Sequence, residues 1–407
     1  MIRKTIILTL TICLSLVLFL PSSIQAQNAL NITRNTTSTE FPDGLHFNLS
    51  AQSRVNITDV RLHYTVDHTS FAEVTSEVFI EFIPDTTIEV KWIWDMRKTG
   101  GLPPGTTVEY WWTIINDQGD RAITDPIKVS FDDNRYIWQN LTEDEITIYW
   151  YHGEKSAAEE MMLASRQALT QLAKDTGAEL KKAVKIYLYA NTRDLQGAMI
   201  HPQEWTGGTA FTNFGTITIG LVPSRPDSIK RAIAHELTHL VIAQVTFNPY
   251  NELPTWLNEG LAMYNEGPLE TEFTNLLKKA IAKNSLISVR SLSSPFSAYA
   301  ESAMQAYAQS QNLVEFLIKN YGQTKMFQLL NVFHEGSSYN NALIKVYGFD
   351  MDGLNTLWRD YTIKKYREAE VTTAMILPPI ARNIIRQASE LLSNVLSVAP
   401  SWVLNRG

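Results

Sequence analysis

The spacing of apolar residues changes partway along this chain, and this change constrains the fold more than any other feature. Between residues 41 and 133, apolar and polar residues alternate with a period of two, which is typical of half-buried β-strands. From residue 146, strand-like and helix-like segments alternate, and nearly everything beyond Asp227 has helical periodicity. A chain of 407 residues is long enough for two or three domains. The sequence therefore predicts a multidomain protein, with an all-β domain followed by an α+β domain.

The first domain is predicted over residues 41–135 as an immunoglobulin-like or fibronectin-like β-sandwich. Glycine-rich and proline-rich stretches separate the strand-like segments and supply turns. The count of about six or seven short strands in roughly ninety residues is close to that of such a sandwich. The absence of a cysteine pair favours the fibronectin kind. The strand pattern is carried by residues 45–49, 60–66, 78–82, 88–94, 108–115 and 127–131.

The N-terminal residues predict export. Arg3 and Lys4 precede a short apolar run, and the small residue Ala26 follows it, as in a secretory signal peptide over residues 1–26. The alternative is an uncleaved membrane anchor, although the apolar run is short for a membrane span. We therefore expect a secreted or cell-surface protein without stable membrane insertion after cleavage. Because the only cysteine, Cys13, lies in this segment, the mature chain has no disulfide.

The remaining segments complete the predicted domain order. Residues 27–40 are polar and rich in Asn and Thr, which predicts a flexible linker. The second domain is predicted over residues 136–366, with residues 136–141 joining it to the first. Residues 367–407 are predicted as a helical tail with one amphipathic helix over residues 380–398.

The charge of the chain excludes one class of partner. The net charge is −7, and the sequence has no long block of lysine and arginine. Nucleic acid is therefore not an expected partner. The sequence predicts no particular oligomeric state.

A His-Glu-x-x-His motif carries the clearest chemical signal. Residues Pro226, Asp227 and Ser228 before it suit a helix start, and Asn248-Pro249 after it stops a helix. Because an α-helix turns about 100° per residue, histidines four positions apart project from nearly one face. The two histidines can therefore hold one metal ion. The glutamate between them can then lie beside that ion and take a proton from metal-bound water.

A catalytic zinc site usually has three protein ligands, so a third is expected downstream. The segment Leu253–Ala262 offers one, because Pro254 and Thr255 suit the start of a second helix. Glu259 falls one turn into that helix. The intervening residues are enough for one helix to end and for the next to cross beneath the metal.

The motif His-Glu-Leu-Thr-His, followed by Pro-Thr-Trp-Leu-Asn-Glu-Gly-Leu-Ala, resembles the gluzincin branch of zinc metallopeptidases. It is most similar to the peptidase MA-like domain family. The resemblance implies a zincin-like catalytic domain with one zinc ion, a glutamate as general base and a peptide or protein substrate. Carried over to this chain, the metal ligands are His235, His239 and Glu259, and the base is Glu236. A weaker likeness extends from about residue 146 to about residue 361.

The resemblance also implies a tyrosine or histidine that stabilises the oxyanion formed at the scissile carbonyl. Tyr307 is the preferred candidate because a polar helix face there could meet the cleft, and Tyr264 and Tyr299 are the alternatives.

Three other residues have side chains that could take part in a metal site. Asn258 is a candidate to orient a ligand without binding the metal. His201 lacks a partner at a suitable spacing and is not expected to be a ligand. Glu266 shares a helical face with the third ligand, but Gly267-Pro268 indicates that the helix is already ending there.

Together these features predict an exported zinc-dependent peptidase that hydrolyses peptide bonds with a zinc-bound water activated by Glu236. The first alternative is an exported binding or structural module whose metal site only stabilises the fold. A carboxylate placed beside the metal, as Glu236 is, has no purpose in such a site. The second alternative is a zinc hydrolase that acts on a non-peptide amide or ester.

Overall fold

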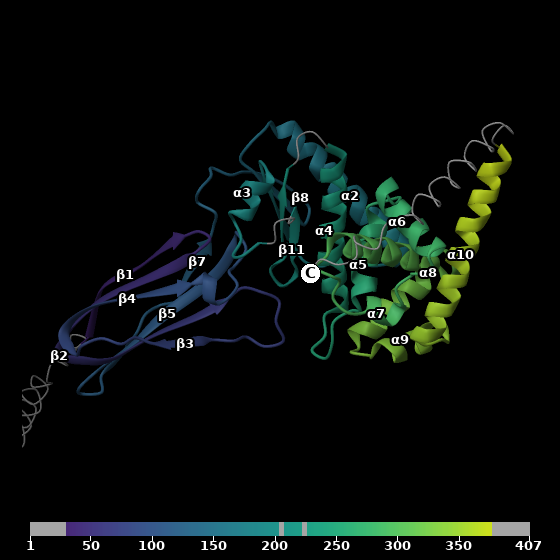
Figure 1. Ribbon diagram of the computed structural model, residues 1–407. Coiled ribbons are helices and arrows are strands. Elements are labelled where there is room, and N and C mark those ends of the chain that lie inside the picture. The colour runs from purple at the N-terminus through teal and green to yellow at the C-terminus, as the bar shows by residue number, and fades with distance from the viewer. Residues whose placement is uncertain (1–29, 203–206, 222–225, 377–407) are drawn as a thin grey trace, which may run out of the picture. The chain divides into compact units, whose positions relative to one another are not determined.

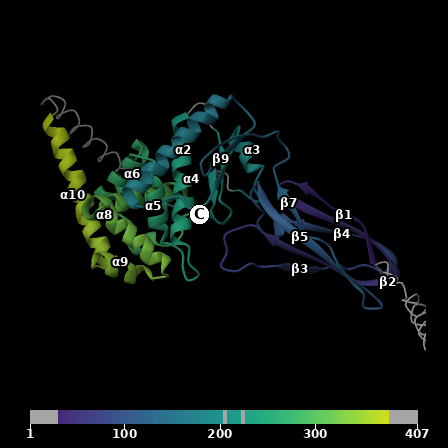
Figure 2. The ribbon, with the colours of Figure 1, turned by 180° about the vertical axis from the view of Figure 1, so that it is seen from behind.

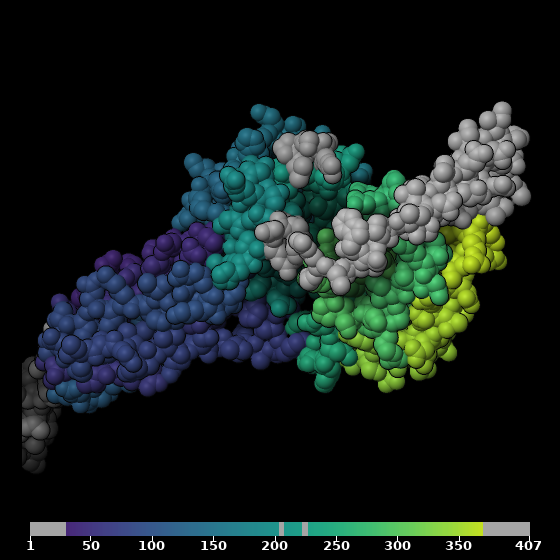
Figure 3. All heavy atoms as spheres, viewed as in Figure 1, coloured from purple at the N-terminus to yellow at the C-terminus, as the bar shows by residue number. Residues whose placement is uncertain are grey.

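The computed structural model describes residues 30–202, 207–221 and 226–376. The chain divides into two compact units, coloured purple to blue and blue-green to yellow in Figure 3. The β unit extends to Ile137 and includes Gly197–Pro202, and the α+β unit comprises Trp138–Gln196 and the residues from Gln203 onward. The predicted signal peptide lies outside the described residues. None of the described helices combines the length and the apolar character that a membrane span requires.

The β unit contains one hydrogen-bonded sheet of seven strands. In chain order the elements are β1 (Leu30–Glu40), β2 (Gly44–Val66), β3 (Ser76–Phe79), β4 (Asp85–Asp95), the short 3₁₀-helix η2 (Met96–Lys98), β5 (Thr106–Asn116), β6 (Arg121–Ile123) and β7 (Ile127–Phe131).

The long strand β2 changes partners along its length. Its first half pairs with β1 and β4, and the register shifts between Gln52 and Ile57. Its second half pairs with β3 and β5. The sheet curls so that Phe47 in the first half meets Tyr110 of β5, with ring centroids 5.0 Å apart. The predicted two-sheet sandwich is therefore not confirmed, because β2 joins both halves into one curled sheet.

The prediction of a flexible linker over residues 27–40 is wrong, because residues 30–40 form β1 along the edge of the sheet. The polar composition of this segment is that of an edge strand. Asn35 accepts hydrogen bonds from the Tyr110 hydroxyl at 3.0 Å and from Trp112 Nε1 at 3.1 Å. A polar residue in β1 thus satisfies two polar groups of the aromatic core.

The α+β unit begins with a five-stranded sheet in the order β11-β12-β10-β9-β8. The three inner strands are parallel, and the two outer strands run antiparallel to their neighbours. This arrangement leaves β11 at one edge. The strands are β8 (Gln139–Glu143), β9 (Ile146–Trp150), β10 (Val184–Tyr189), β11 (Gly208–Phe211) and β12 (Thr216–Gly220).

Most of the rest of this unit is helical, as the periodicity predicted. The helix α8 contains one non-helical residue, Gly322, at which two helical segments meet in a kink. The helices are α2 (Lys155–Thr176), α3 (Thr192–Gln196), η3 (Thr212–Phe214), α4 (Pro226–Thr246), α5 (Thr255–Asn265), α6 (Thr271–Ala282), α7 (Val289–Leu292), α8 (Ala300–His334), α9 (Tyr339–Tyr347) and α10 (Met351–Ile376).

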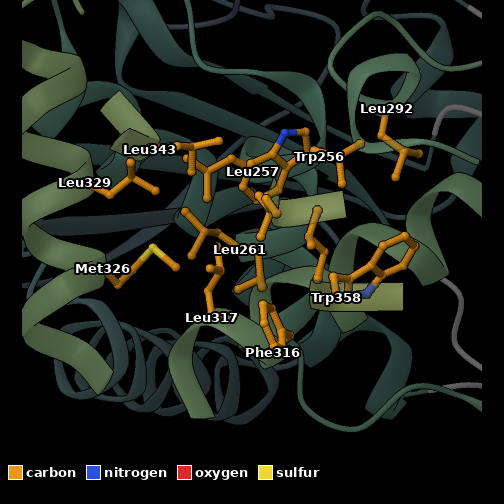
Figure 4. Packing of buried hydrophobic residues seen from close by; sticks show 14 of the residues in the cluster. Trp256, Leu257, Leu261, Leu292, Phe316, Leu317, Met326, Leu329, Leu343 and Trp358 are labelled. Atoms are coloured by element: carbon orange, nitrogen blue, oxygen red, sulfur yellow. The ribbon is translucent and has the colours of Figure 1, made fainter. Parts of the chain in front are cut away.

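Helix α4 packs between two hydrophobic cores. Its residues Ile233, Leu237 and Leu240 are buried with α2 against the five-stranded sheet. Further along the helix, Val241 and Val245 belong to a second core built by the later helices. Figures 1 and 2 show α4 between the sheet and those helices, and Figure 4 shows residues of α5, α7, α8, α9 and α10 in the second core. The helix that carries the His-Glu-x-x-His motif is therefore held firmly on two sides.

Two predicted boundaries differ from the structure. Residues 136–141 were predicted to join the domains, but residues 139–143 form β8 of the second sheet. The predicted start of the tail at residue 367 falls inside α10, which continues to Ile376. The amphipathic helix predicted over residues 380–398 lies outside the described residues.

Candidate metal centre

Helix α4 presents both histidines of the motif on one face. The rings of His235 and His239 lie with centroids 4.8 Å apart and planes at 80°. The spacing of four residues places them one above the other, as expected for an α-helix.

Glu259 of α5 points at both histidines. Its Oε2 lies 3.6 Å from His235 Nε2 and 3.5 Å from His239 Nε2. Ligand atoms of the three residues all lie within 4.8 Å of one another. The structure therefore brings together the three residues predicted as metal ligands.

The donor set fits a zinc ion. Two imidazole nitrogens and a carboxylate oxygen form one of the ligand sets of catalytic zinc. Glu259 Oε2 is buried and has no hydrogen-bond partner among the described residues. A buried carboxylate oxygen without a hydrogen bond is costly, and a cation held between it and the two imidazoles removes that cost.

Each histidine has a partner on its other ring nitrogen. His235 Nδ1 lies 2.7 Å from Glu266 Oε1, and His239 Nδ1 lies 3.2 Å from Asn258 Oδ1. Such partners fix the tautomer and the ring orientation, and they leave Nε2 to face the ligand set. The structure places Asn258 in the orienting position considered from the sequence.

The sequence argues only that Glu266 is unsuitable as a ligand, and its contact with His235 could not be predicted from it. The residue follows directly after α5 ends, and only the packing of α5 on α4 brings it to the histidine. The shared helical face with Glu259 was the one available sequence signal.

The charges of the site favour a bound cation. Burial opposes charging of His235, but Glu259 and Glu266 outweigh it and raise the pKa of His235 to about 10. Burial would raise the pKa of Glu259, but His235 and His239 lower it to about 2. The carboxylates thus stabilise positive charge at the centre.

Glu236 is half-buried beside the ligands, and desolvation raises its pKa despite the opposing effect of the two histidines. Strand β11 passes close to it. A Cβ atom added to Gly208 would lie 3.1 Å from Glu236 Oε1, so the glycine lets the strand approach the carboxylate. Glu236 is not one of the three residues whose ligand atoms lie within 4.8 Å of one another.

A cavity of about 410 Å³ opens next to His235 and Glu236. Its volume lies in the range of small-molecule and side-chain pockets. Its walls combine apolar side chains, such as Met263 and Phe273, with charged and polar ones. The cavity therefore gives access to Glu236 and to His235, one of the predicted ligands.

Among the three candidate tyrosines, Tyr307 lines this cavity. Burial and then the carboxylates Glu259 and Glu236 raise its pKa, so its hydroxyl stays protonated and can donate a hydrogen bond. Tyr264 packs against the second core, and Tyr299 is 81% exposed.

Gly260, the residue after Glu259, lets α5 lie directly on α8. A Cβ atom at this position would lie 2.5 Å from the Ser310 carbonyl oxygen and 2.7 Å from Val314 Cγ2. Replacing Gly260 by alanine is expected to lower the free energy of unfolding by about 1–3 kcal/mol through overpacking. Because the closest contact is with a backbone oxygen, we expect the upper end of this range, and the gain of about 1 kcal/mol that alanine brings to a helix leaves a net loss of about 2 kcal/mol.

Urea unfolding of the parent and the Gly260→Ala variant measures this difference. Gly207→Ala is the matched control, because a Cβ atom there has no described atom within 4 Å. A Gly260→Ala protein as stable as the parent would show that the two helices are not packed this closely.

The geometry is that of a metal site with two histidines and one glutamate, and the family match covers the same part of the chain. Residues 164–364 match the model of the Peptidase MA superfamily. This match supports a zincin-like peptidase family for the part of the chain that carries the site. No curated protein matches the chain.

Two solved structures illustrate what the chain is similar to. An M1 zinc metallopeptidase from Deinococcus radiodurans aligns at 12% identity and a TM-score of 0.33, covering 82% of this chain and 94% of that one. OgpA from Akkermansia muciniphila, in complex with an O-glycopeptide, aligns at 9% identity and a TM-score of 0.20. That alignment covers 26% of this chain, and the chain spans only 30% of the length of OgpA.

Proposed function

We propose that this protein is an exported zinc-dependent peptidase, with His235, His239 and Glu259 as zinc ligands and Glu236 as general base. The observation that carries the proposal is the convergence of ligand atoms from two histidines and one glutamate beside a separate carboxylate, Glu236, at the wall of a cavity. A bound zinc ion would polarise the substrate carbonyl and acidify water. A purely structural site would have no use for Glu236.

The residues around the centre have separate tasks. Glu236 accepts a proton from the water that attacks the carbonyl carbon and then passes it to the leaving amine. Its place at the wall of the cavity puts it within reach of a substrate. Tyr307 donates a hydrogen bond to the developing oxyanion. Glu266 and Asn258 hold the two imidazoles in place.

The open edge of β11 supports a peptide substrate. The strand lies at the end of the sheet, so one of its edges has no partner strand among the described residues. An extended peptide can add to such an edge through main-chain hydrogen bonds. Because Gly208 lies against Glu236, a peptide on this edge passes the base.

Chelation tests the function on the mature chain that begins at Gln27. We expect the purified protein to contain one zinc per chain and to cleave unstructured peptides. Removing the metal should abolish cleavage, and adding zinc should restore it. The measurements are metal content and cleavage of a fluorogenic peptide library, with an ester panel alongside.

Each outcome of this experiment separates the three candidate functions. Zinc-dependent cleavage of esters alone would support a non-peptide hydrolase. Zinc binding with no turnover of either panel would support a binding or structural module and contradict the proposal.

A further inference from the structure

Arg231 lies one helical turn before His235 on α4, in the wall of the cavity. Its Nη2 lies 2.9 Å from Glu266 Oε2, and its Nε lies 3.3 Å from Glu270 Oε1. Its Nη1 donates hydrogen bonds to the backbone carbonyls of Glu266 at 3.3 Å and of Pro268 at 3.2 Å. One side chain therefore fixes both the Glu266 carboxylate and the backbone that follows α5.

The backbone after α5 is shaped for this contact. Gly267 has a φ of 107°, a conformation that favours glycine, and the carbonyls on either side of it both accept from Arg231. Cationic side chains commonly stabilise the last carbonyls of a helix in this way. The Arg231 and Glu266 side chains are only 21% and 12% exposed, so solvent and salt screen this pair less than a surface ion pair.

The Glu266 carboxylate is shared between this arginine and the metal centre. Oε2 contacts Arg231, while Oε1 lies 2.7 Å from His235 Nδ1. A carboxylate held at both oxygens cannot rotate without losing one of these contacts. We propose that Arg231 is a positioning residue of the metal centre, which acts through Glu266 to fix the direction in which His235 presents Nε2. The inference rests on the proposed zinc site.

The charges around the site lead to the same inference. Glu236, Glu259, Glu266 and Glu270 bring four carboxylates to this region, and Arg231 contacts two of them. Without the guanidinium, Glu266 would stay buried among like charges or turn towards solvent. Turning towards solvent breaks its hydrogen bond to His235. Loss of Arg231 should therefore loosen His235 without changing any ligand.

Zinc affinity of the full mature chain tests this role. Arg231→Met should weaken zinc binding about 10-fold to 100-fold, the usual effect of losing a partner outside the ligand set. The matched control is Lys230→Met, which removes a positive charge from the neighbouring residue of the same helix. Lys230 is 43% exposed and lies 3.7 Å from Glu160, so its loss should change the affinity by no more than about twofold.

The affinities are measured by competition with a chromophoric chelator, and the absorption spectrum of the cobalt-substituted protein reports the geometry of the centre. A double-mutant cycle with Glu266→Gln then shows whether Arg231 acts through Glu266. We expect the double variant to bind zinc no more weakly than Glu266→Gln alone. Additive losses, or an unchanged affinity in Arg231→Met, would overturn the proposal.

A second variant keeps the test decisive if Arg231→Met does not fold. Arg231→Lys keeps the charge and the aliphatic stem, but one ammonium group cannot reproduce the planar contacts of a guanidinium. Arg231→Lys should weaken zinc binding less than Arg231→Met does. In a protein that already carries Glu266→Gln, the lysine should cause no further loss of zinc affinity. If Arg231→Lys still weakens zinc binding when the Glu266 carboxylate is absent, Arg231 does not act through Glu266.

These measurements are independent of turnover. Zinc binding by the parent without peptide cleavage would contradict the proposed function and leave the positioning role intact. An unchanged zinc affinity in a folded Arg231→Met protein would remove the positioning role and leave the peptidase proposal intact.

Discussion

Replacing Glu236 by glutamine is expected to remove nearly all peptide cleavage while leaving the zinc content of the protein unchanged. Glutamine has the same shape but cannot accept the proton of the attacking water. A positioned general base contributes about 10²-fold to 10⁴-fold to such reactions. The zinc content should persist because Glu236 is not among the three converging ligands.

The turnover number for a fluorogenic peptide and the zinc bound per chain test this prediction. Glu301→Gln is a suitable control, because it makes the same chemical change on a side chain that is 69% exposed and paired with Lys279. Full activity in the Glu236→Gln protein would show that another group acts as the base. Loss of zinc from that protein would mean that Glu236 helps to hold the metal.

Replacing Glu259 by alanine is expected to weaken zinc binding by at least about 100-fold and to abolish cleavage with it. Structural zinc sites bind their ion with about 10–16 kcal/mol. Divided among four ligands, this is roughly 3 kcal/mol for each ligand, or about a hundredfold in affinity. The Glu259 oxygen that faces both histidines has no other partner among the described residues. Its removal therefore takes away a ligand rather than a fold contact.

Competition with a chelator measures this loss, and Asn258→Ala on the same helix provides the comparison. Asn258 contacts His239 from outside the ligand set, so its replacement should cost less affinity, about 10-fold. A Glu259→Ala protein that binds zinc as tightly as the parent would place the third ligand elsewhere.

The local part of this architecture could be predicted from the sequence. Both ends of α4 and the start of α5 follow from Pro226, Pro254 and the Asn248-Pro249 pair, and helical spacing alone puts His235 and His239 on one face. The alternation of apolar residues likewise predicted strands that the structure contains, such as β5 and β7. These features depend on neighbours a few residues apart.

Features that depend on distant contacts were not predictable in the same way. The polar sequence of β1 resembles a linker until Asn35 is seen to satisfy Tyr110 and Trp112, which are far away in the chain. The two strand patterns within β2 read as separate strands because nothing local shows that one strand bends and changes partners. Glu266 was missed for the same reason, since its partner His235 lies on another helix.

The double burial of α4 has a consequence for the energetics of the whole unit. The two histidines stand on a helix shared by both cores, whereas Glu259 stands on a helix embedded in one of them. The metal ion binds only when the two histidines and Glu259 are correctly placed. This placement exists only in molecules in which both cores have formed. By mass action, ligation then stabilises both cores together, so saturation with metal makes them melt as a single cooperative block.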